Sequence, residues 1–170
     1  MSLKLVAAFL VLAGCGGCGF SMAAAKRREE WELRQFLRAL EYMECELQFR
    51  QTDLPSLCRM VSGVTDGAVS ALFSNLSDLL NRQDTSEPLE CVRKAAYSQE
   101  GLSGSARALI MELGSTLGCF DLPGQLRGIA SVKRNCIRIM DELIRGRDNR
   151  LRSYQTLGLC AGAALAIIFI

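Results

Sequence analysis

Cysteine is the residue type with the clearest capacity for chemistry in this chain, which has eight cysteines and no histidine. The lack of histidine removes the commonest general base and the commonest metal ligand. Cys15 and Cys18 have the C-x-x-C spacing, but no second pair completes a zinc site, and the pair lies in an apolar run that would not tune a redox thiolate. Most other cysteines occupy apolar positions of helical patterns, where a reduced cysteine packs as a small hydrophobic residue. The sequence therefore predicts no metal site and no cofactor.

Two polar stretches could carry other chemistry. Residues 101–105, Gly-Leu-Ser-Gly-Ser, lack the lysine and the spacing of a phosphate loop, and Ser103 lacks the flanking residues of a nucleophile elbow. We interpret the stretch as a turn before a helix. Glu41, Glu44 and Glu46 are expected on the exposed side of a helix, where carboxylates are usually solvated rather than paired for acid–base catalysis. The chain is therefore predicted not to be an enzyme.

Two apolar runs lie near the ends of the chain and are expected to anchor the residues between them. Hydrophobic residues make up 49% of the sequence, and the excess lies in residues 4–25 and 154–170. The first run is followed at once by three basic residues, 26–28, and the second follows an arginine-rich stretch. A helix of about twenty apolar residues spans a bilayer, and basic flanks stay on the cytosolic side. We predict two transmembrane helices in the cell membrane, with residues 26–153 as a cytosolic domain.

Small residues recur four apart in both runs. Gly158 and Gly162 do so in the second run, and Ala13 and Gly17 in the first. Such spacing lets membrane helices approach closely, so the spans are expected to pack on each other or on a partner's span, although glycine is also common in membrane helices in general. Attraction to anionic lipid headgroups explains a set of arginines that gathers toward the second run. This set is Arg134, Arg138, Arg145, Arg147, Arg150 and Arg152.

The first run has an alternative interpretation as the signal segment of an exported lipoprotein. Residues 12–15, Leu-Ala-Gly-Cys, resemble a lipoprotein cleavage site with Cys15 as the acylated N-terminus. Against this, the run stays apolar to residue 25, and the stronger basic cluster lies on the wrong side for export. An exported helical domain acylated at Cys15 remains the alternative to a membrane-anchored cytosolic one.

The middle of the chain predicts helices only, because apolar residues recur at i+3 and i+4 without period-two alternation. Thr52 is expected to cap the second helix, Gly118 to end the fifth and Asp121 to cap the sixth. The expected inner faces include Val64 in the second helix and Ile137 in the sixth. Every connection is short, which favours antiparallel neighbours. The predicted fold is all-α, an antiparallel bundle of about six helices between two terminal transmembrane helices.

Three stretches resemble the stage III sporulation protein AB family of endospore-forming bacteria. They are residues 33–54, residues 113–125 and residues 157–162, and the resemblance covers essentially the whole chain. The middle stretch is the most specific, because two glycines, a leucine and an aspartate recur at fixed offsets after an apolar helix. The residues that the resemblance marks as partner-binding or structural are Arg34, Gln35, Glu44, Glu46, Gly114, Gly118, Asp121 and Gln125.

The resemblance implies a role in sporulation. Members of the family sit in the mother-cell membrane around the forespore, in a multi-protein channel that links the two compartments. Their soluble part is similar to the cytoplasmic helical domain of the platform proteins of type II secretion and type IV pilus systems, which implies docking of a secretion-type ATPase, the stage III sporulation protein AA. No nucleic acid and no small-molecule substrate is expected. Gly114 and Gly118 also permit close helix approach and a left-handed cap, so their motif is either a corner between helices or a partner contact.

Overall fold

The chain is all-helical in a computed structural model. The structure describes the backbone of residues 2–50, 52–82, 87–117 and 121–169, and the side chains of residues 24–50, 52–82, 87–117 and 121–146. Within these ranges the chain forms helices and no strand, as the periodicity predicts. The helices are α1 (Ser2–Phe49), α2 (Leu54–Val64), α3 (Gly67–Arg82), α4 (Pro88–Ser98), α5 (Gly104–Gly114) and α6 (Leu122–Phe169).

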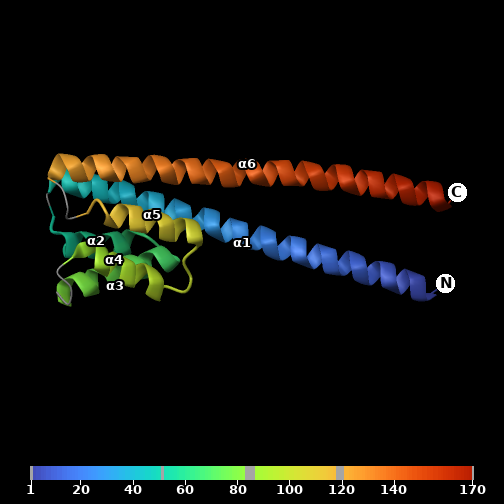
Figure 1. Cartoon of the computed structure of the whole chain (residues 1–170), viewed down its shortest axis with the longest axis horizontal. Helices are drawn as coiled ribbons and strands as arrows, with labels where there is room; N and C mark the ends of the chain where they lie inside the picture. The colour runs from blue at the N-terminus through green and yellow to red at the C-terminus, as the bar shows by residue number, and fades with distance from the viewer. Residues whose placement is uncertain (1, 51, 83–86, 118–120, 170) are drawn as a thin grey trace.

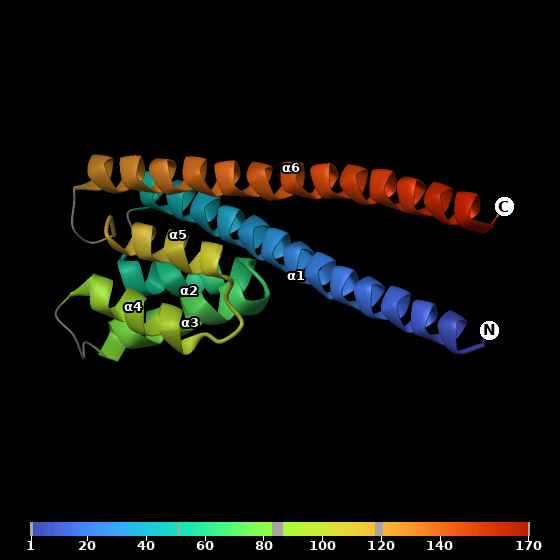
Figure 2. The ribbon, with the colours of Figure 1, turned by 45° about the vertical axis from the view of Figure 1, so that its right-hand side comes forward.

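The two long helices, α1 and α6, form an antiparallel pair (Figure 1). Both extend beyond the four short helices at the same end, so the two chain termini lie at that end (Figures 1 and 2). Among residues whose side chains are described, no helix is long and apolar enough to cross a membrane. The second predicted span, nearly all of the first, and Cys15, Cys18, Gly158 and Gly162 lie outside those residues.

The short helices α2 to α5 run back and forth along one side of the long pair (Figure 2). The α2–α3 corner and the α4–α5 loop face the end that holds the termini, while α2 begins at the opposite end, which we call the distal end (Figure 1). Apolar side chains from all six helices meet in one core. The rings of Phe36 in α1 and Phe73 in α3 stack in it at 6.3 Å between centroids. Burial of this core supplies most of the driving force for folding.

Capping side chains start three of the helices. Asp53 caps α2 by accepting the Ser56 N–H at 3.2 Å, so the prediction that Thr52 caps this helix is wrong. Ser103 caps α5 by accepting the Ala106 N–H at 3.3 Å, as expected for a turn before a helix. Asp121 caps α6 by accepting the Gly124 N–H at 3.1 Å, which confirms the predicted cap. Each of these bonds satisfies a backbone donor that the helix itself leaves free.

Several expected details differ from the structure. Val64 is 36% exposed rather than inward, because α2 ends there and the chain turns at Gly67, whose φ is +65°. Ile137 is 39% exposed on α6, since neighbouring positions of that helix already fill the contact with the core. Helix α5 ends at Gly114, earlier than predicted, and the predicted stop at Gly118 lies outside the described residues.

Candidate functional site

A buried carboxylate ties α1 to the α4–α5 loop. Glu32 is 2% exposed, and its Oε2 accepts the Ser103 backbone N–H at 2.9 Å. Its Oε1 accepts the Arg28 Nε–H at 3.2 Å, and Arg28 also donates to the Gly101 carbonyl at 3.1 Å. Two donors therefore satisfy the buried charge, which would otherwise be costly. The Ser103 N–H is thereby occupied and does not serve as an anion-binding group.

Glu29 extends the same contact by one helical turn. The Ser105 hydroxyl donates to Glu29 Oε1 at 2.6 Å, and the Lys26 ammonium lies 2.9 Å from its Oε2. Desolvation disfavours the charged carboxyl, but the Ser105 hydrogen bond and Lys26 outweigh it and lower the pKa of Glu29. We call this set of contacts the clamp: Lys26, Arg28, Glu29 and Glu32 on α1, with Gly101, Ser103 and Ser105. It borders a shallow cleft of about 320 Å³.

The α1–α6 seam is joined by polar contacts at its edge and apolar ones inside. Lys133 of α6 lies 3.2 Å from a Glu44 oxygen and 3.8 Å from a Glu41 oxygen of α1. Farther along, the Cys136 thiol donates to the Leu33 carbonyl at 3.5 Å. Both contacts are long-range in sequence, so they fix the register of the two long helices. Glu44, one of the residues marked by the family resemblance, thus has an observed structural contact.

Glu46 lies in the last turn of α1, at the distal end of the bundle. Glu46 is 9% exposed and accepts from the Thr52 hydroxyl at 3.3 Å, so its expected place on the exposed side of the helix is wrong. Desolvation and the neighbouring Glu46 carboxylate raise the pKa of Tyr42. Phe49, by contrast, is 77% exposed at the C-terminal end of α1.

The other residues marked by the resemblance do not form one patch. Gln35 is buried, and its Oε1 accepts the Asp66 N–H at 3.2 Å, whereas Arg34 is exposed and pairs with Glu30 at 2.8 Å. Gln125 is half-buried in the first turns of α6, near the capping Asp121. The structure therefore gives several of these residues internal contacts and leaves Arg34 and Asp121 on the surface.

Close helix approach is confirmed at Gly114. A Cβ at this buried position would lie 2.8 Å from a methyl group of Val92 in α4. A second close approach, which the sequence does not predict, is at Gly128 of α6, where a Cβ would lie 2.6 Å from Thr116 Cβ. Glycine at these two positions lets the last turn of α5 and its following turn pack between α4 and α6.

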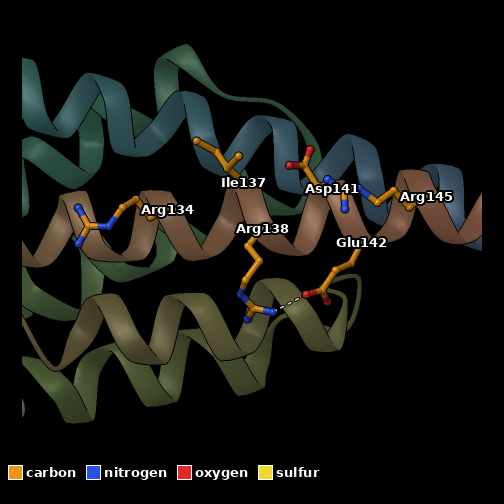
Figure 3. A pocket seen from close by; sticks show the side chains of 6 residues that line it. All are labelled: Arg134, Ile137, Arg138, Asp141, Glu142 and Arg145. Atoms are coloured by element: carbon orange, nitrogen blue, oxygen red, sulfur yellow. Dashed lines mark hydrogen bonds and ion pairs between the residues drawn. The ribbon is translucent and has the colours of Figure 1, made fainter.

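The outer face of α6 carries a charged stripe around one exposed apolar side chain (Figure 3). Arg138 and Glu142 pair at 2.6 Å, and Arg138 also donates to Asn135 at 2.7 Å. Ile137, which is 39% exposed, and Asp141 project from the other side of the same face, toward α1 (Figure 3). The residues of the stripe line a shallow hollow of about 300 Å³: Arg134, Ile137, Arg138, Asp141, Glu142 and Arg145.

The described side chains can be compared with the requirements of metal, thiol and small-ligand sites. No group of three or more Cys, Asp or Glu among them could hold a metal ion. Burial raises the pKa of Cys58 to about 12 and that of Cys136 to about 11, so both thiols are poor nucleophiles. Cys45 is exposed on α1. The two hollows are shallow and open, unlike the enclosed, largely apolar pockets that hold small ligands.

Fold and surfaces together define an all-helical protein in which a long antiparallel helix pair carries a small bundle. The chain belongs to the stage III sporulation protein AB family, whose family model matches residues 4–170. It is 24% identical over 168 residues to the stage III sporulation protein AB of Bacillus subtilis (strain 168), covering 98% of each chain. A solved structure of a stage III sporulation protein AB has the same fold, with a TM-score of 0.61 and 21% identity over 72% of this chain and 98% of that one. The predicted family is therefore confirmed.

Proposed function

We propose that this chain is a non-enzymatic platform subunit of the sporulation channel between mother cell and forespore, and that its helical domain docks the stage III sporulation protein AA ATPase. Membership of the stage III sporulation protein AB family supports the sporulation role. The observation that carries the platform role is the shared direction of α1 and α6, which extend past the bundle at the same end (Figure 1). If residues 4–25 and 154–170 span the membrane, this direction leaves the whole bundle on one face of it.

The predicted topology is tested at Cys45, which is exposed on α1. In a variant that keeps Cys45 as its single cysteine, a membrane-impermeant maleimide should leave the thiol unlabelled in intact cells and label it in inverted vesicles. Moving the single cysteine to Ser153, the last residue of the predicted cytosolic domain, should give the same labelling pattern. Labelling of Cys45 from outside the cell would contradict a cytosolic bundle.

We assign ATPase docking to the charged stripe of α6. Protein interfaces favour an apolar centre surrounded by arginines and other polar groups, and Ile137 with Arg134 and Arg138 has this composition. The double variant Arg134→Glu/Ile137→Asp should abolish co-purification of the full-length chain with the ATPase. Lys94→Glu, a charge reversal on the exposed face of α4, is the matched control and should leave it intact. Equal retention by both variants would contradict docking at this stripe.

The same strains test the biological role. Cells that carry only the stripe variant should fail to complete spores after engulfment, as a deletion strain should, while the Lys94→Glu strain should sporulate. Mass spectrometry of the N-terminus separates the anchored form from the lipoprotein alternative, because processing at Cys15 removes every residue before it. Normal spores from the deletion strain would contradict the channel role.

A further inference from the structure

One end of the bundle faces the same way as the chain termini. The α2–α3 corner and the α4–α5 loop form this end, beside the point where α1 leaves the bundle (Figures 1 and 2). We call it the proximal end. The clamp fixes the position of the proximal end along the axis of α1, because Gly101 is hydrogen-bonded to Arg28 and Ser103 is hydrogen-bonded to Glu32. The loop therefore lies beside residues 28–32 and keeps that position as long as the clamp holds.

The height of the proximal end can be compared with the thickness of a bilayer. A helix rises about 1.5 Å per residue, so Arg28 lies about 4.5 Å beyond Ala25, the last residue of the first predicted span. The polar headgroup layer on each side of the hydrocarbon core is about 5–8 Å thick. By the same rise, Trp31 lies about 9 Å and Glu32 about 10.5 Å beyond Ala25, so the α4–α5 loop beside residues 28–32 extends from the headgroup layer to just outside it if that span crosses the membrane. This step rests on the proposed membrane anchoring.

The proximal end also presents an aromatic side chain suited to this layer. Trp31 is the single tryptophan of the chain and is 42% exposed. Its six-membered ring lies against Gly67. A Cβ at Gly67 would lie 2.6 Å from this ring, so only glycine leaves room for the indole to pack on the α2–α3 corner. Side chains of a helix lean toward its N-terminus, which for Trp31 is the direction of the predicted membrane. Tryptophan is enriched at membrane–water interfaces.

The charges at the proximal end have both signs. Lys26, Arg27 and Arg28 are basic and exposed on α1, and two of them hold the clamp carboxylates. Asp66 and Glu100 are exposed carboxylates at the same end. Because the three basic residues are nearest to the predicted span, they meet the headgroup phosphates first. We propose that the proximal end rests on the lipid headgroups of the membrane that anchors the chain, with Trp31 inserted among them.

The fluorescence of Trp31 can be used to test this contact. The full-length chain is reconstituted in phosphatidylcholine/phosphatidylglycerol vesicles that contain a lipid spin-labelled on the headgroup, and tryptophan emission is compared with that in unlabelled vesicles. We expect the headgroup label to quench Trp31 strongly, and aqueous acrylamide to quench it several-fold less than in the detergent-solubilised chain. The matched control is the double variant Trp31→Phe/Phe49→Trp, which moves the single indole to the exposed distal end. There, acrylamide should quench and the lipid label should not.

The outcomes separate this inference from the anchoring on which it rests. Vesicle flotation after alkaline extraction reports anchoring, and circular dichroism reports the fold of both forms. A chain that floats but whose Trp31 is quenched by acrylamide alone has a proximal end in water, which overturns the inference and leaves the anchoring intact. A Trp31 that neither quencher reaches is covered by protein, such as a second copy of the chain, which also overturns it. A chain that does not float overturns both.

Discussion

The carboxylate of Glu32 and the backbone N–H of Ser103 meet at 2.9 Å, although 71 positions of sequence separate them. Glu32 lies at 2% exposure, and the amide that it accepts belongs to the residue that caps α5. One side chain of α1 thereby fixes both the path of the α4–α5 loop and the start of the next helix. The effect of losing it should be measurable in the stability of the whole chain.

Glu32→Ala should lower the free energy of unfolding by about 1–3 kcal/mol, because the Ser103 N–H loses its acceptor. Urea unfolding of the full-length chain in detergent, followed by circular dichroism, measures the change. Glu32→Gln keeps an acceptor and should lose less. Arg34→Ala, which breaks the exposed pair with Glu30, should change the free energy by about 0.5 kcal/mol or less. Equal losses for Glu32→Ala and Arg34→Ala would contradict the importance of the clamp.

Gly114→Ala should destabilise the chain by about 1–3 kcal/mol, because the new methyl group has no room against Val92. Adding Val92→Ala removes the opposing methyl groups, so the double variant should recover part of the steric loss. Gly63 in α2 has nothing within 4 Å of an added Cβ. Gly63→Ala should therefore be neutral or stabilising by up to about 1 kcal/mol through helix propensity. A stable Gly114→Ala chain would show that α4 and α5 can separate without loss.

The Ser105–Glu29 hydrogen bond should make stability depend on pH. The pKa of Glu29 in the folded chain is lowered from its ordinary value of 4.5, so its contribution is present above pH 4.5 and is lost as the pH falls through the lowered value. Ser105→Ala should raise this pKa and make the loss of stability in acid less steep. Urea midpoints at neutral pH and below pH 4.5 give the comparison, with Ser131→Ala on the exposed side of α6 as control.

Thiol labelling should distinguish buried from exposed cysteines in the folded chain. With a pKa of about 12 rather than 9.0, Cys58 has a thiolate fraction about a thousandfold below the ordinary one near neutral pH. In single-cysteine variants, iodoacetamide should modify Cys45 readily and Cys58 only after unfolding in urea. Mass spectrometry follows both reactions. Rapid labelling of Cys58 without urea would show that the α2 region opens readily.

Helix number and type could be predicted from sequence, because the apolar stripes repeat with the helical period. The exact caps could not be predicted in every case. Thr52 and Asp53 are adjacent and both of types that cap helices, and Asp53 caps because α2 begins at Leu54, directly after it, while the Thr52 hydroxyl donates to Glu46. The α6 cap was predictable, since Asp121 directly precedes an apolar helical pattern.

The clamp was not predicted, because nothing local links Glu32 to a loop 71 residues away. A weak signal existed, since Glu32 lies four residues before Phe36 and therefore on the apolar side of α1. A carboxylate in such a place needs buried partners. The tight approach at Gly128 was missed for a similar reason, because a helical glycine acquires meaning only once Thr116 is known to face it.

The pairing of the first helix with the last has a consequence for biosynthesis. The apolar side of α1 contacts α6, which leaves the ribosome after the five helices before it, so α1 cannot be fully covered until α6 has been made. The local contacts of α2 with α3 and of α4 with α5 can form earlier, since they close short loops. We therefore expect nascent chains truncated before α6 to hold a collapsed set of short helices beside an exposed α1, the form on which chaperones would act.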